Sequence, residues 1–149
     1  MKYDIVKNSQ GWVYSETVKK HFFHPKNFIR GDSPRWKFNG YGESGSAACG
    51  DVMRNWIFVD KRSQKINRFG WKTYGCASAI ASTSILSEML LENGGMKIND
   101  ALKITPTDIL DRLGDLPIKK VHCSVLGDRA LKNAIADYFK FSSEKMVGK

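Results

Sequence analysis

Two strand-like stretches joined by a short polar turn constrain the fold of this chain more than any other feature. Asp51–Val59 and Ile66–Tyr74 both mix large apolar residues with polar ones, and Asp60–Gln64 between them is typical of a turn. This pattern predicts an antiparallel hairpin. The next stretch, rich in Ala, Ser, Ile, Leu and Met, predicts a buried helix over 77–91 that Asn93–Gly95 ends. A hairpin followed by several helices favours an α+β fold.

Two short helices have recognisable ends. Ser15 is a capping residue for a helix that His24–Pro25 ends, with an apolar stripe formed by Val18, Phe22 and Phe23. Thr105, followed by a proline and an acid in the first turn, predicts a helix through Leu113. His21 has no acidic or cysteine neighbour in the sequence, and we expect it to be an ordinary surface or capping residue.

The last helix has the clearest amphipathic pattern. Its apolar face carries Leu131, Ala134, Ile135, Tyr138 and Phe139, and its polar positions are Asp128, Arg129, Lys132, Asn133 and Asp137. By contrast, the segment 30–50 is rich in glycine, serine, proline and aromatic residues, which favours loops or short strands.

Length and composition predict one domain. The 149 residues, 42% of them hydrophobic, can bury one core, and we expect it over 13–141, between a flexible extension (1–12) and a flexible tail (142–149). No apolar run approaches the ~20 residues that span a bilayer, and the first residues lack a secretory signal, so a cytoplasmic protein without membrane contact is expected. Lys and Arg are scattered in short runs, which argues against nucleic-acid binding despite the net charge of +9.

Three cysteines, an odd number that cannot pair completely, carry the chemistry. Cys49 precedes a strand, Cys76 lies at a strand-to-helix turn, and Cys123 precedes the last helix. In an extended segment Asp51 would share one side of the chain with Cys49, and His122 adjoins Cys123. A single free cysteine is most often core filler, but three at such junctions indicate reactive thiols or metal ligands. The sequence contains no Cys-x-x-Cys pair.

Seven segments in the right order resemble one known family. They are Tyr14–Val18, His24–Asn27, Ala48–Met53, Lys72–Ser82, Thr107–Ile109, Val121–Leu126 and Ala134–Tyr138. The chain resembles the IscU and NifU N-terminal type of iron–sulfur cluster assembly scaffold from about Tyr14 to Phe139. This resemblance implies the SufE/NifU superfamily fold, in which helices pack on one face of a small three-stranded antiparallel sheet.

The resemblance also implies a site and its cargo. It assigns Cys49, Asp51, Cys76, His122 and Cys123 to one pocket that holds a transient 2Fe-2S cluster, its Fe2+ precursor, or Zn2+. A 2Fe-2S cluster needs four ligands, so either Asp51 or His122 would complete the three thiolates. Cys123 is the first candidate for the persulfide acceptor. Such a chain is a carrier and not an enzyme.

The implied partners are a cysteine desulfurase, a ferredoxin-type electron donor and acceptor apoproteins. Leu116, Pro117, Lys119 and Lys120 are candidate docking residues. The family's chaperone peptide, Leu-Pro-Pro-Val-Lys, is altered here at Ile118 and Lys119, so a chaperone would meet a changed motif. The chain is expected to be a monomer or a cluster-bridged dimer. The alternative is a zinc-bound, SufU-like sulfur acceptor, but the pair His122–Cys123 favours the IscU and NifU type.

Overall fold

The computed structural model describes residues 16–46, 51–74, 77–114 and 121–147, without the side chains at 46, 51, 77, 121–125 and 141–147. The elements along the chain are α1 (Glu16–Phe23), β1 (Gly40–Ser46), β2 (Asp51–Asp60), β3 (Lys65–Thr73), α2 (Ala77–Leu91), the 3-10 turn η2 (Glu92–Gly94), α3 (Ile98–Ala101), α4 (Pro106–Leu113) and α5 (Val121–Val147). The order confirms the α+β class. No helix in these ranges is both long enough and apolar enough to cross a membrane.

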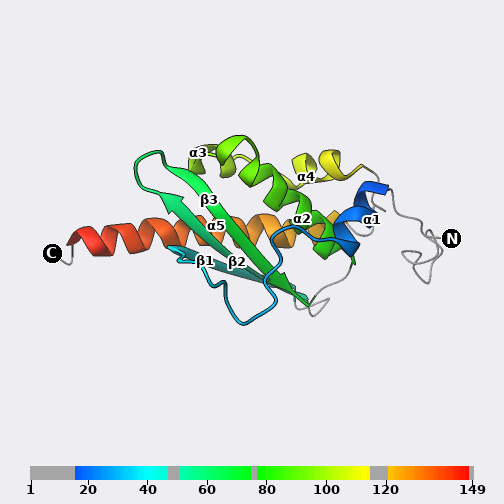
Figure 1. The fold of residues 1–149 in the computed structure, drawn as a ribbon, viewed down its shortest axis with the longest axis horizontal. Coiled ribbons are helices and arrows are strands. Elements are labelled where there is room, and N and C mark those ends of the chain that lie inside the picture. Colours follow the sequence, from blue (N-terminus) through cyan, green and yellow to red (C-terminus); the bar gives the residue numbers. More distant parts are fainter. Residues whose placement is uncertain (1–15, 47–50, 75–76, 115–120, 148–149) are drawn as a thin grey trace.

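The sheet is antiparallel with strand order β1-β2-β3, and helices cover one of its faces (Figure 1). The long helix α5 packs on β1 and β2, while α2 packs on β3. Register pairs Gly42 with Asn55 and Asn55 with Trp71, so these three positions share the face toward the helices. The core between the layers includes Met53, Ile57, Phe69, Trp71, Leu86, Leu90, Leu131 and Ile135, all buried. The expected arrangement of helices on one sheet face is confirmed.

The glycines of β1 allow α5 to approach closely. A Cβ added at Gly42 would lie 2.2 Å from the carbonyl oxygen of Ala130, and one at Gly40 would lie 2.6 Å from that of Ala134. Any side chain at these two positions would force the helix away from the sheet. The glycine content that favoured loops or short strands therefore reflects, at Gly40 and Gly42, a strand in contact with a helix backbone.

Side chains of α5 also cover the outer edge of β1. The backbone N–H of Tyr41 donates to Asp137 Oδ2 at 2.9 Å, and Asn133 Nδ2 donates to the carbonyl oxygen of Glu43 at 2.7 Å. An edge strand with unpaired backbone groups would recruit another strand. The two polar residues of the amphipathic helix thus replace a fourth strand.

The segment before β1 covers the opposite face of the sheet. The N–H of Ile29 donates to the carbonyl oxygen of Trp71 at 2.8 Å, which pairs the segment with the edge of β3. On the face opposite the helices, a Cβ at Gly70 would lie 2.6 Å from Ile29 Cδ1 and 3.1 Å from Trp36 Cζ2. Gly70 pairs with Trp56, which is only 3% exposed. The aromatic-rich segment before β1 matches none of the seven segments that carry the family resemblance. Its side chains cover this face of the sheet.

The helix ends agree with the sequence in two places. Asp108 N donates to Thr105 Oγ1 at 3.2 Å and Thr105 N donates to Asp108 Oδ2 at 2.9 Å, which is a capping box at the start of α4. After α2, Asn93, Gly94 and Gly95 have φ values of 56°, 82° and 105°, a left-handed run that a helix cannot continue through. The short helix α3 has no counterpart in the sequence analysis.

Several expectations from helical periodicity are wrong. Phe23 and Phe139, assigned to apolar stripes, are 42% and 44% exposed. Asp128, assigned to the polar positions of the last helix, is buried, because Lys132 Nζ donates to its Oδ2 at 3.0 Å and to the carbonyl oxygen of Ile104. The helix itself runs from Val121 to Val147 and so extends beyond the positions that its apolar pattern marked.

Candidate functional site

The structure places the backbone of three of the five predicted site residues. Asp51 is the first residue of β2, and His122 and Cys123 lie in the first turn of α5, not before the helix as the sequence predicted. Cys49 and Cys76 lie outside the described residues, as do the docking candidates Leu116, Pro117, Lys119 and Lys120. The described segments on either side of these residues show at which end of the sheet the chain enters and leaves each of them.

The ends of the three strands meet at one end of the sheet. Ser46, the last residue of β1, pairs with Asp51, and Met53 pairs with Thr73, the last residue of β3. Cys49 therefore falls within the connection between β1 and β2. Cys76 falls within the connection between β3 and α2, which begins at Ala77. The flanks of both cysteines lie at this end.

The start of α5 reaches the same end. Ser44 Oγ donates to the carbonyl oxygen of Leu126 at 2.6 Å, whereas Asn133 contacts Glu43, so β1 and α5 run in opposite directions. The turn before Leu126, which holds His122 and Cys123, must therefore extend toward Ser46 and Asp51. Figure 1 shows the starts of α2 and α5 and the tip of β3 on the same side of the molecule.

Close packing fixes α5 against β2 and α2 at this end. Asn55 Nδ2 donates to the carbonyl oxygen of Gly127 at 3.2 Å, and a Cβ at Gly127 would lie 2.7 Å from Thr83 Oγ1. Only glycine allows the first half of α5 to lie this close to α2. The starts of the two helices are thereby held in a fixed relation.

The electrostatics of this end favour anions. Helices α2 and α5 both begin here, and the unpaired N–H groups and dipoles of the two helices place partial positive charge at their first turns. Neither helix has an acidic residue in its first turn to cancel that charge.

The sequence analysis missed His21, which the structure buries against the middle of α2. His21 Nδ1 lies 2.7 Å from Ser84 Oγ, which also accepts from the N–H of Lys26 at 2.8 Å. Burial lowers the pKa of His21, with Glu88 opposing the shift. Its partner lies 63 residues away, so no local pattern could reveal it.

Serine hydroxyls of α2 hold the segment after α1 in place. Ser87 Oγ donates to the carbonyl oxygen of Lys26 at 3.1 Å, and Trp71 Nε1 donates to the same oxygen at 2.7 Å. The Ala- and Ser-rich composition of this helix therefore serves close packing and these buried hydrogen bonds. Among the described side chains, no three His, Cys, Asp or Glu residues come together as a metal site.

Comparison with known proteins shows the family. The family model described as the NifU-like N terminal domain matches residues 13–145. The nitrogen fixation protein NifU of Azotobacter chroococcum mcd 1 is 45% identical over 85% of this chain, but the match covers 39% of that protein. The iron-sulfur cluster assembly scaffold protein IscU of Aquifex aeolicus is 42% identical over 84% of this chain and 75% of its own length.

Solved structures agree on the fold. The crystal structure of a nitrogen-fixing NifU-like protein (N-terminal) from Brucella abortus matches with a TM-score of 0.63 at 13% identity, over 85% of this chain and 94% of that one. A structure titled as a putative iron-sulfur cluster assembly scaffold protein for the SUF system, from Fervidobacterium islandicum, matches with a TM-score of 0.56 at 19% identity, over 82% and 96%. At these identities the likeness concerns the fold alone.

Proposed function

The chain belongs to the NifU-like N-terminal domain family, and we propose that it is a scaffold on which an iron–sulfur cluster is assembled and then released. One observation carries the proposal. The start of β2, the start of α5 and the described flanks of Cys49 and Cys76 all lie at one end of the sheet. Relatives that share about 40% of their residues with this chain, such as the Aquifex protein, carry the name of cluster assembly scaffolds.

The cargo is a 2Fe-2S cluster held by Cys49, Cys76 and Cys123, with His122 or Asp51 as the fourth ligand. Thiolates are the preferred ligands of such clusters. An imidazole or carboxylate binds iron less firmly than a fourth thiolate, which suits a cluster that must leave. Fe2+ is the precursor, and the same donors can hold Zn2+ in tetrahedral geometry.

Sulfur arrives as a persulfide on the desulfurase, and Cys123 is the acceptor that we favour. Its thiolate attacks the outer sulfur of that persulfide, so a persulfide forms on Cys123 and the desulfurase cysteine leaves as a thiolate. The start of α5 stabilises the attacking thiolate. The neighbouring imidazole of His122 is a suitable proton acceptor.

The protein acts as a carrier and not as an enzyme, since the cluster is its cargo. A ferredoxin-type donor supplies electrons, and apoproteins receive the cluster. The segment with Leu116, Pro117, Lys119 and Lys120 precedes α5 directly and is proposed as a docking surface for the desulfurase or a chaperone. A cytoplasmic location would place the chain with these partners.

Anaerobic reconstitution tests the proposal. The wild-type chain, mixed with Fe2+, L-cysteine, a cysteine desulfurase and a reductant, should develop the visible charge-transfer absorption of a cluster. Cys76→Ser removes one of three thiolates and should abolish the absorption. Ser33→Ala, in an exposed loop on the other face of the sheet, is a control for handling and should leave it unchanged.

Two results would contradict the scaffold proposal. One is a colourless wild-type product under these conditions. The other is a chain that is purified with one tightly bound zinc and stimulates desulfurase turnover without taking up iron. That second result would establish the zinc-bound sulfur acceptor instead. Metal and acid-labile sulfide analysis of the same samples distinguishes the two.

A further inference from the structure

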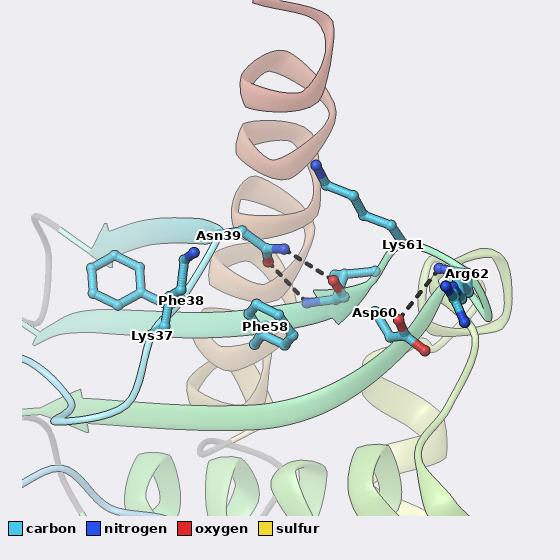
Figure 2. A pocket seen from close by; sticks show the side chains of 8 residues that line it. Lys37, Phe38, Asn39, Phe58, Asp60, Lys61 and Arg62 are labelled. Atoms are coloured by element: carbon cyan, nitrogen blue, oxygen red, sulfur yellow. Dashed lines mark hydrogen bonds between the residues drawn. The ribbon is translucent and has the colours of Figure 1, made fainter. Parts of the chain in front are cut away.

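A hollow lies at the end of the sheet opposite the proposed cluster site. Its volume is about 360 Å³, and it is lined by Lys37, Phe38, Asn39, Phe58, Val59, Asp60, Lys61 and Arg62. Figure 2 shows Phe58 between Lys37 and Phe38 on one side and Lys61 and Arg62 on the other. These residues come from the segment before β1, from the last three positions of β2 and from the turn that follows β2.

Asn39 holds the wall of the hollow, because it forms hydrogen bonds to β2 as a residue of a neighbouring strand would. Its backbone N–H donates to the carbonyl oxygen of Ile57 at 2.9 Å. Its side-chain amide donates to the carbonyl oxygen of Val59 at 3.0 Å and accepts from the Val59 N–H at 2.8 Å. The pairing of β2 with β3 shifts between Phe58 and Val59. These hydrogen bonds between Asn39 and the backbone of β2 fix the wall of the hollow, and ligand-binding sites are usually formed in advance in this way.

The rim of the hollow is cationic. Lys37, Lys61 and Arg62 are all exposed, and within the described parts of the chain none of them forms an ion pair. The one carboxylate in the lining, Asp60, accepts from Ser63 Oγ at 2.9 Å and from the Arg62 N–H at 3.3 Å. Three cations therefore face one carboxylate that is already hydrogen-bonded.

Two phenylalanines also line the hollow. Phe38 is 39% exposed although it is a large apolar residue, and Phe58 is half-buried beside it. Two rings at the base of a cationic rim suit a ligand that combines an apolar group with negative charges. The volume, near the lower end for ligand pockets, fits one or two side chains better than an extended polymer.

We propose that this hollow docks an acidic segment of a partner protein. An aromatic or aliphatic side chain of that segment packs on Phe38 and Phe58, and flanking Asp or Glu side chains pair with Lys37, Lys61 and Arg62. A nucleic acid is the less suitable partner, because a hollow of about 360 Å³ holds one or two side chains and not an extended polymer. Charge complementarity of this kind raises association rates and gives specificity.

Occupation of the hollow leaves the other end of the sheet accessible. Strand β2 begins at Asp51 and ends at Asp60, and ten strand residues span roughly 30 Å. A partner held at the hollow can therefore stay bound while another protein occupies the cluster end. The docking surface shares no residue with the proposed cluster site, so its test does not depend on cluster assembly.

A peptide selection tests the docking surface. A phage-displayed library of random 12-residue peptides is panned on the full chain, and the enriched peptides are synthesised and measured by isothermal titration calorimetry. We expect sequences with Asp or Glu on both sides of Phe, Trp or Leu, with micromolar dissociation constants that rise several-fold between 0.05 and 0.3 M salt. In 15N-labelled protein, the amide shifts should move at 37–39 and 58–62.

Matched variants locate the binding. Lys37→Glu/Arg62→Glu should weaken the best peptide at least tenfold, while Lys20→Glu/Arg129→Glu, with the same change in net charge, should leave it within twofold. Phe38→Ala should weaken it about tenfold, and Leu102→Ala, also 39% exposed, should not. The proposal is overturned if no acidic–apolar peptides are enriched, if the two charge variants lose affinity equally, or if a 12-nucleotide single-stranded DNA competes as well as the peptide.

Discussion

His21 illustrates how one buried side chain links pH to stability. Burial lowers the pKa of His21 in the folded state below its ordinary value of 6.5, so the unfolded chain binds the proton first as pH falls. Stability contributed by neutral His21 is therefore complete above about pH 6.5 and is lost as pH falls toward the lower folded pKa. Of the charged groups around it, Glu88 opposes this lowering of the pKa, whereas Lys20, Lys26 and Arg112 add to it.

Replacement of this imidazole should remove that dependence. We expect His21→Gln to cost about 1–2 kcal/mol at pH 8, through the lost hydrogen bond to Ser84, and to lose less stability than wild type between pH 8 and pH 5.5. Urea unfolding at both pH values measures this. His24→Gln, at an exposed position, should behave like wild type; equal pH dependence in wild type and His21→Gln would contradict the argument.

A second residue-scale prediction concerns release of the cargo. If Asp51 is a weak ligand of the cluster, Asp51→Ala should lengthen the lifetime of the reconstituted cluster several-fold, because His122 and the thiolates then hold the iron. The decay of the visible absorption in the presence of a chelator measures the lifetime. Asp111→Ala on α4 is the control, and an unchanged lifetime in Asp51→Ala would remove Asp51 from the release step.

At the scale of elements, the contact between β1 and α5 depends on Gly42. Its substitution by alanine places a Cβ 2.2 Å from the carbonyl oxygen of Ala130, so the helix must shift. We expect Gly42→Ala to lower the free energy of unfolding by about 1–3 kcal/mol or more in urea titrations. Gly31→Ala, where the nearest atom is 3.8 Å away, should change it by less than about 0.5 kcal/mol. Similar effects at the two positions would show that the helix has room to move.

The elements that the sequence predicted are those specified by local chemistry. The hairpin, the buried helix α2 and the capping box at Thr105 follow from alternation, composition and cap residues within a few positions. Strand β1 was less clear, because its glycines are explained only by Ala130 and Ala134 far along the chain. Burial of Asp128 and exposure of Phe139 likewise depend on which elements pack on α5. The sequence predicted Asp51 and Cys123 near the starts of a strand and a helix, but it could not show that these starts lie at one end of the sheet, because that depends on how α5 packs along β1.

At the scale of the whole molecule, the net charge of +9 points to acidic partners. We expect the affinity for the desulfurase to fall several-fold between 0.05 and 0.3 M salt, and further when Lys119→Glu/Lys120→Glu replaces the two lysines before α5. Calorimetric titration measures both effects. Lys97→Glu/Lys103→Glu carries the same charge change elsewhere and should bind nearly as wild type. Strong binding that is independent of salt would contradict this view.

Other segments of the chain lie along both edge strands of the sheet, β1 and β3. Asp137 and Asn133 bond to the outer strand on one side, while Phe28 and Lys97 lie beside β3 on the other. Within the described parts of the chain, neither edge strand is therefore free to join the sheet of a second copy side by side. A dimer that shares a cluster must form end to end, with the long axes roughly in line, and small-angle scattering would register it as a particle with about twice the maximum dimension of the monomer.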